Sequence, residues 1–146
     1  MSQTQPHGMQ PYFAYGSNMD SGQMAVRCPG AERVGVAVLR DYRVLINAQG
    51  VGTVIPAKRE SVFGLLWRLS EKNVEALDSY EGVASGHYHR EYLTVDSGGD
   101  QIQALVYVAA NVAPGKPRPG YLEGVLKAAT DLGLPGDYIA ELANMA

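Results

Sequence analysis

One carboxylate in the sequence, Glu81, occupies a position where a charged side chain is unfavourable. Residues 71–81 have helical spacing, and Glu81 follows Val74 and Leu77 on the apolar stripe, so we expect it to point inward. It also falls in the last helical turn, where the negative end of the helix dipole disfavours a carboxylate. Burial and the dipole would both raise its pKa, as in a general acid or base. A Glu81 rotated outward, or one bonded to amides of the following Gly-rich loop, is the structural alternative.

A second candidate is the turn Gly16-Ser17-Asn18-Met19, which separates a strand expected at 11–15 from a short helix expected at 21–27. A corner of this kind leaves backbone N–H groups unpaired at a helix N-terminus, which favours an anion. Gly16 allows a positive φ and the close approach of a ligand. The turn is therefore a candidate anion site, with an ordinary tight turn as the alternative.

The histidines and the single cysteine offer weaker chemistry. His87 and His89 would face the same side of a strand, but a zinc site needs a third ligand that the sequence does not supply, so surface histidines are the alternative. Cys28 has no obvious histidine partner, which favours an ordinary buried thiol. Neither a common phosphate loop nor a nucleophile elbow is found in the sequence.

The elements that must position these residues predict an α+β fold. Strands are expected at 11–15, 32–39, 42–47, 53–55, 61–69, 89–96 and 101–109, and helices at 21–27, 71–81, 120–132 and from about 135 to 143. Pro56 is expected to end the strand before it, Ser70 to cap helix 71–81, and Gly82 to close that helix. Strands and helices do not alternate strictly, so we expect a small mixed or antiparallel β-barrel with flanking helices.

Length and composition predict one globular domain. Of the 146 residues, 46% are hydrophobic and 18% charged, and we expect a disordered tail over 1–9 and a single domain over 10–146. The net charge of −3 is spread without blocks, which argues against a nucleic-acid partner or an anionic membrane surface. Neither a signal peptide nor a transmembrane run is visible, and the lone cysteine fits a cytoplasmic location. The oligomeric state stays open, a homodimer included.

Three stretches together resemble the gamma-glutamylcyclotransferase family. They are Phe13-Ala14-Tyr15-Gly16-Ser17-Asn18-Met19, Phe63-Gly64-Leu65-Leu66-Trp67, and the segment from Leu77 to Tyr88 that contains Glu81-Gly82-Val83. The likeness covers about residues 11–143. It implies a small barrel with a cavity at the corner, a small-molecule gamma-glutamyl substrate, and no metal or cofactor.

The resemblance also implies a role for each candidate residue. The amides of Gly16, Ser17, Asn18 and Met19, which follow Tyr15, would hold the substrate's alpha-carboxylate; Glu81 would be the acid/base; Tyr88, Tyr107 and Tyr121 would line the pocket; and Gly52 and Thr53 would lie at its edge. Each of these tyrosines could instead pack in the core.

The reaction implied by the family is an intramolecular cyclisation. The substrate's own alpha-amine attacks its side-chain carbonyl, giving 5-oxoproline and a free amine or amino acid, so no enzymic nucleophile is needed. This chemistry would belong to gamma-glutamyl and glutathione metabolism. The alternatives are removal of a gamma-glutamyl cap from a biosynthetic intermediate on the same site, and a non-catalytic small-molecule-binding domain.

Overall fold

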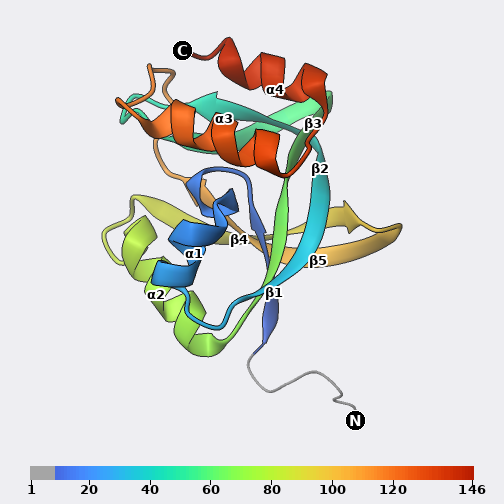
Figure 1. Cartoon of the computed structure of the whole chain (residues 1–146). Helices are drawn as coiled ribbons and strands as arrows, with labels where there is room; N and C mark the ends of the chain where they lie inside the picture. Colours follow the sequence, from blue (N-terminus) through green and yellow to red (C-terminus); the bar gives the residue numbers. More distant parts are fainter. Residues whose placement is uncertain (1–8) are drawn as a thin grey trace.

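The computed structural model describes residues 9–146, in which the strands close into a barrel (Figure 1). The strands are β1 Gln10–Ala14, β2 Glu32–Ile46, β3 Gly52–Leu69, β4 Tyr88–Ser97 and β5 Asp100–Ala109, and their order around the barrel is β1-β3-β2-β4-β5. The helices are α1 Ser21–Arg27, α2 Glu71–Glu81, α3 Tyr121–Asp131 and α4 Gly136–Ala143, with a 3-10 turn, η1, at Ser17–Met19. The predicted α+β fold with a small barrel and flanking helices is confirmed.

Strand β1 closes the barrel and delivers the chain to the corner. It pairs antiparallel with β3 from Gln10–Leu69 to Ala14–Leu65, and parallel with β5 at Tyr12–Leu105. Every other named strand pairing within residues 9–146 is antiparallel, so the barrel is mixed through β1 alone. Strand β1 is therefore held on both edges by other barrel strands. The residues that follow it begin at the end of the barrel, within reach of side chains from several elements.

The structure corrects the predicted breaks in β2 and β3. The strands expected at 32–39 and 42–47 are one strand, and those at 53–55 and 61–69 are another. Asp41 and Arg59 both adopt positive φ, of 65° and 69°, and Asp41 Oδ1 accepts a hydrogen bond from the Arg59 amide at 3.0 Å. Asp41 and Arg59, which lie between the predicted strands, therefore form a paired irregularity in a continuous ladder. Pro56 does not end its strand; it pairs opposite Tyr42, beside this irregularity.

Helix α2 begins and ends as predicted, which fixes the position of its last residue. The Ser70 side chain accepts from the Asn73 amide and the Asn73 side chain accepts from the Ser70 amide, forming a capping box. Gly82 follows in the left-handed conformation with φ 67°, and its amide bonds to carbonyls of the last turn. Val74 and Leu77 are buried at 3% and 0% exposure, so the inner face of α2 is held against the barrel.

The helices cover the barrel in two pairs. Figure 1 shows α1 and α2 side by side near one end, and α3 with α4 near the other. Phe63 of β3 packs edge-on against Tyr138 of α4, with ring centroids 5.1 Å apart. Leu65 and Leu66, on opposite faces of β3, are 0% and 1% exposed, so this strand is covered on both sides.

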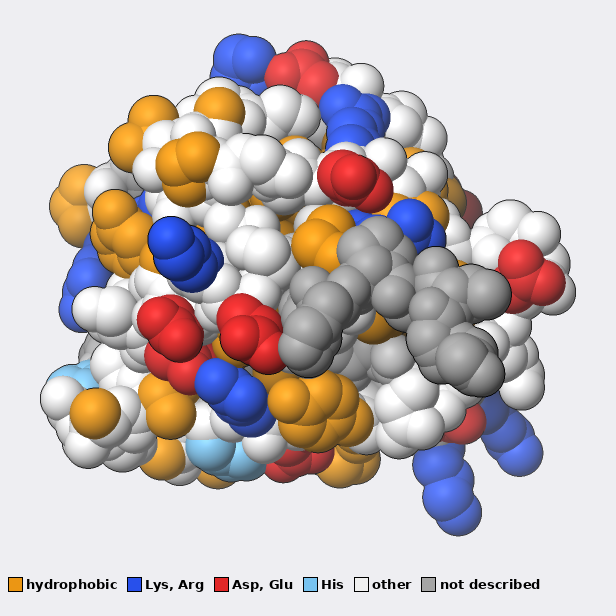
Figure 2. Space-filling view, turned by 90° about the horizontal axis from the view of Figure 1, so that it is seen from below, with side chains coloured by type: hydrophobic (Ala, Val, Ile, Leu, Met, Phe, Trp, Pro, Cys, Tyr) orange, Lys and Arg blue, Asp and Glu red, His pale blue; other side chains and the backbone are white. Residues whose placement is uncertain are grey.

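The remaining expectations concern the N-terminal tail, the spread of charge over the surface and membrane-spanning helices. The predicted disordered tail, 1–9, falls on residues 1–8, which lie outside the described residues, and on Met9. Figure 2 shows one face of the molecule, where acidic and basic side chains are interspersed. Among residues 9–146, no helix combines the length and the apolar character needed to cross a membrane.

Candidate active site

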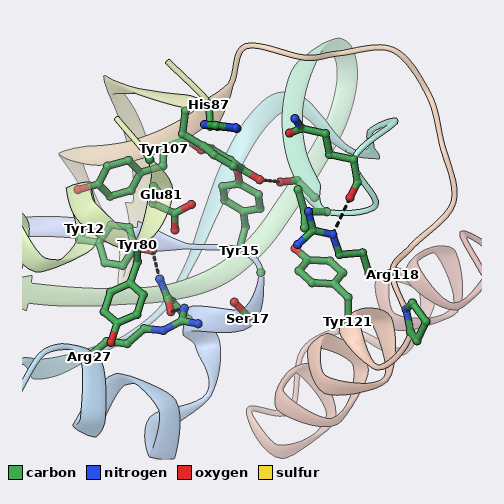
Figure 3. A pocket seen from close by; sticks show the side chains of 18 residues that line it. Tyr12, Tyr15, Ser17, Arg27, Tyr80, Glu81, His87, Tyr107, Arg118 and Tyr121 are labelled. Atoms are coloured by element: carbon green, nitrogen blue, oxygen red, sulfur yellow. Dashed lines mark hydrogen bonds between the residues drawn. The ribbon is translucent and has the colours of Figure 1, made fainter. Parts of the chain in front are cut away.

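A cavity of about 540 Å³ lies where β1 ends, between the C-terminal end of α2 and the segment that leads into α3 (Figure 3). Its volume is typical of small-molecule sites. The residues that the sequence predicted and that line this cavity are Tyr15, Gly16, Ser17, Asn18, Glu81, Tyr88, Tyr107 and Tyr121. Residues from both halves of the chain thus share one cavity.

The corner lines this cavity, and its backbone is held in place by several hydrogen bonds. Within residues 9–146, no hydrogen bond uses the amide of Ser17 or Asn18. Asn18 itself is 3% exposed: its side chain donates to Tyr12 Oη at 3.0 Å and accepts from Arg27 at 2.7 Å. Its carbonyl also accepts from the Trp67 indole at 3.1 Å. These contacts fix the turn while leaving its two amides available to an anion.

Met19 and Thr53 do not line the cavity. The Met19 side chain is 1% exposed in the core, and its amide donates to the Gly16 carbonyl at 3.0 Å. Thr53 is fully buried, and its hydroxyl accepts from the Ala109 amide at 2.9 Å. Met19 therefore offers neither its side chain nor its amide to the cavity, whereas Gly52, the other expected edge residue, does line it.

Glu81 points into the cavity and is half-buried (Figure 3). Burial raises the pKa of its carboxyl group to about 7, and the charge of nearby Arg27 offsets part of that rise. Within residues 9–146, no hydrogen bond or ion pair satisfies this carboxylate. A carboxyl group with a pKa near neutrality, open to the cavity and unpaired, is equipped to accept and return a proton.

Three of the tyrosine hydroxyl groups that surround the cavity donate to acceptors other than Glu81. Tyr15 Oη donates to the Tyr107 carbonyl at 2.6 Å, and Tyr88 Oη donates to the Gly52 carbonyl at 2.7 Å. Tyr107 Oη donates to Asp78 Oδ1 at 2.7 Å. These three tyrosines shape an apolar wall without stabilising a negative charge on Glu81, which is consistent with its raised pKa.

Asp78 lies behind this wall and is itself held by a cation. Arg90 forms a two-pronged contact with its carboxylate, and the bond from Arg90, followed by that from Tyr107, holds the pKa of Asp78 below its usual value. Asp78 and Glu81 lie one helical turn apart on α2, but one is a fixed, paired anion and the other an unpaired acid. These opposite environments push the pKa values of the two carboxyl groups apart, a pattern that is typical of a site with one structural and one reactive carboxyl group.

Tyr121 approaches the corner closely because two glycines leave room for it. A Cβ atom at Gly16 or at Gly52 would lie 2.8 Å from Tyr121 Oη, too close for a stable contact. The φ of Gly16 is −123°, so this glycine does not adopt the positive φ that its lack of a side chain allows. Both glycines instead serve the packing of one hydroxyl group at the floor of the cavity.

Comparison with known proteins identifies the family. The sequence model of the AIG2-like family matches residues 61–142. A gamma-glutamylcyclotransferase of Mus musculus is 32% identical over 142 residues, which cover 90% of this chain and 76% of that protein. A gamma-glutamylcyclotransferase of Bos taurus is also 32% identical, over 92% of this chain and 77% of its own. The chain belongs to the gamma-glutamylcyclotransferase family. A solved gamma-glutamyl cyclotransferase structure superposes with a TM-score of 0.87 at 29% identity, over 94% of this chain and 88% of that one.

Part of the wall of this gamma-glutamylcyclotransferase cavity was not predicted. The additional lining residues are Tyr12, Arg27, Gln49, Val51, Tyr80, Gly82, His87, Arg118 and Pro119. Arg27 offered a signal, because it is a basic residue at the end of the helix that follows the corner. Gln49, Val51 and Arg118 come from irregular segments with no periodicity, so only the fold brings them to the site.

The two candidate histidines and the cysteine lie in three different environments. His87 lines the cavity and precedes β4, whereas His89 is exposed and pairs with Glu91 at 2.7 Å, so the two do not share a face of one strand. Among residues 9–146, no group of three or more metal-ligating side chains lies together. Cys28 is 1% exposed with its thiol directed to the Asn73 carbonyl, and burial raises its pKa to about 11, so the expected buried thiol is confirmed.

Proposed function

We propose that this enzyme of the gamma-glutamylcyclotransferase type cyclises a gamma-glutamyl amide to 5-oxoproline and uses Glu81 to transfer the proton. The observation that carries this proposal is an unpaired, half-buried Glu81 with a pKa near 7, in the same cavity as the free amides of the corner. The first group suits proton transfer and the second suits binding of a carboxylate.

Binding of the alpha-carboxylate would orient the reacting groups. The amides of Ser17 and Asn18, with Gly16 beside them, would hold this carboxylate, and the tyrosine wall would confine the rest of the glutamyl chain. The flexible chain would thereby be folded so that its alpha-amine meets its own gamma-carbonyl. Well-oriented intramolecular reactions reach effective molarities of roughly 10⁵–10⁸ M, so positioning alone supplies a large part of the acceleration.

Proton transfer would then proceed through Glu81. The alpha-ammonium group must lose a proton before its nitrogen can attack, and its reference pKa of about 8 lies close to that of this carboxyl group. The proton that the ammonium loses before attack would pass to solvent. Ionised Glu81 would accept a second proton from the attacking nitrogen as the C–N bond of the lactam ring forms, and would return it to the leaving nitrogen as the amide bond breaks. The free amine would take up a proton from solvent, so protons and charge balance over the cycle.

The nucleophile in this scheme belongs to the substrate. Cys28 is buried away from the cavity with a raised pKa, which supports a mechanism without an enzymic thiol. A cytoplasmic location and a role in glutathione metabolism are part of the same proposal, since a lone buried cysteine suits a reducing compartment. Removal of a gamma-glutamyl cap from a biosynthetic intermediate would use the same groups and remains the competing reaction on this site.

A substrate screen tests the proposal. The purified protein is incubated with gamma-glutamyl amino acids, glutathione, gamma-glutamylamines and a gamma-glutamyl-capped amine, and 5-oxoproline is quantified. We expect release from at least one of these substrates with an equal amount of free amine. Release of glutamate in place of 5-oxoproline, or no product from any of them, would contradict cyclisation.

A further inference from the structure

The segment before α3 is fastened to the connection between β2 and β3 at the mouth of the cavity. The amide of Gly115 donates to the Ile46 carbonyl at 2.8 Å, and the amide of Arg118 donates to the Gly50 carbonyl at 2.9 Å. The connection is itself held by Asn47, which is fully buried and whose Oδ1 accepts from the Gln49 amide at 3.0 Å. Arg118 therefore projects from a fixed backbone, although it lies in an irregular stretch.

The Arg118 side chain is anchored at its middle. Nε donates to the Gln49 carbonyl at 2.8 Å, and its stem packs on Gly50, where a Cβ atom would lie 2.6 Å from Arg118 Cγ. No carboxylate within residues 9–146 forms an ion pair with it. The two terminal nitrogens of the guanidinium group are thus positioned but unused, an arrangement that suits two-pronged binding of a carboxylate.

The other arginine at the cavity, Arg27, is already committed. It donates to the Asn18 side chain at 2.7 Å and stacks over the Tyr80 ring, 4.7 Å from its centroid. Figure 3 places Arg27 and Tyr80 on one side of the cavity and Arg118, beside Tyr121, on the other, with Ser17 between them. Glu81 lies on the side away from Arg118. The cavity therefore has a free cation beyond the corner, at the end opposite the proton-transfer group.

We propose that Arg118 is a specificity-determining residue that binds the carboxylate of the leaving amino acid, so that this enzyme favours gamma-glutamyl amino acids over neutral gamma-glutamylamines. The inference rests on the proposed function. The corner amides would satisfy the alpha-carboxylate of the glutamyl unit, and a cavity of about 540 Å³ has room beyond that unit for the leaving group. A second carboxylate on the leaving group would find Arg118 as its partner at the mouth.

The experiment compares two ligands that differ only in charge, gamma-glutamyl-alanine and its C-terminal amide. Values of kcat/KM are measured for the wild type, Arg118→Gln and Arg118→Lys. Arg40→Gln is the matched control, because Arg40 is an exposed arginine that pairs with Asp96 and does not line the cavity. Dissociation constants for both ligands are also measured in Glu81→Gln and in the double variant Glu81→Gln/Arg118→Gln, so that binding is read without turnover.

We expect Arg118→Gln to lower the preference for the carboxylate ligand over its amide by about tenfold or more, mainly through KM and Kd. Arg118→Lys should recover part of the preference for the carboxylate ligand, because lysine keeps the positive charge but cannot donate the two parallel hydrogen bonds of a guanidinium group. An unchanged preference, or an equal loss of kcat/KM and affinity for both ligands, would overturn the inference. An equal loss would indicate that Arg118 binds the glutamyl carboxylate or stabilises the segment that carries it. Absence of turnover in the wild type would count against the proposed function, while the ratio of dissociation constants would still decide the role of Arg118.

Discussion

At the scale of single residues, Glu81 is kept in a state that opposes folding and favours chemistry. Tyr15, Tyr88 and Tyr107 line the same cavity but direct their hydroxyl protons to other acceptors, so the ionised carboxylate gains no donor from them. Arg27 offsets part of the cost of burial. Proteins commonly give up stability at an active site in this way, and the cost should be measurable.

Stability should therefore fall as Glu81 ionises. Its folded pKa of about 7 lies above the unfolded value of 4.5, so the folded state binds more protons between these values. The contribution is present below about pH 4.5 and is lost as pH rises to about 7. A pKa raised from 4.5 to about 7 corresponds to roughly 3 kcal/mol, which solvent screening of this half-buried side chain reduces to about 2 kcal/mol. Glu81→Gln should accordingly be more stable than the wild type by about 2 kcal/mol at pH 8, and by much less at pH 4.5.

Urea unfolding of both proteins across this pH range provides the measurement. Glu75→Gln is the matched control, because Glu75 is exposed on the same helix. A stability difference for Glu81→Gln that does not change with pH would show that Glu81 has an ordinary pKa.

At the scale of elements, the shape of the corner depends on a contact between a residue just after β1 and a tyrosine of α3. Gly16 has no positive φ, and its missing side chain is what admits the Tyr121 hydroxyl group. Tyr121 is the first residue of α3, and the corner is the first turn after β1, so one contact joins two elements far apart in the sequence. The geometry of the proposed anion site therefore depends on the position of α3.

Gly16→Ala should damage activity more than folding. The new methyl group would lie 2.8 Å from Tyr121 Oη, so the hydroxyl or the corner must shift. We expect kcat/KM for a gamma-glutamyl substrate to fall about 10- to 100-fold, as for a small misplacement of reacting groups.

Gly22→Ala supplies the comparison for this substitution. Gly22 lies in α1, and its added Cβ would meet only ordinary contacts, the nearest at 3.6 Å, so about 0.5–1 kcal/mol of added stability is expected. Equal activity of Gly16→Ala and Gly22→Ala would remove the corner from the substrate site.

At the scale of the whole molecule, local signals and long-range pairing were not equally predictable. Ser70 caps the start of α2 and Gly82 caps its end through hydrogen bonds that act within a few residues, so both ends could be predicted from the sequence. Asp41 and Pro56 break the local pattern, yet β2 and β3 continue through them, because the pairing of neighbouring strands absorbs the irregularity. Arg118 reaches the site only through the fastening of its segment to Gln49 and Gly50, which no spacing in the sequence reveals.

The most direct test of the central claim is steady-state release of 5-oxoproline by Glu81→Gln, beside the wild type and Glu75→Gln, with the dissociation constant of the same gamma-glutamyl ligand measured for each. Proton transfer through Glu81 predicts that Glu81→Gln binds within a few fold of the wild type while turnover falls by about 10²-fold or more, and that Glu75→Gln matches the wild type in both. Turnover by Glu81→Gln at a rate like that of the wild type would contradict the account.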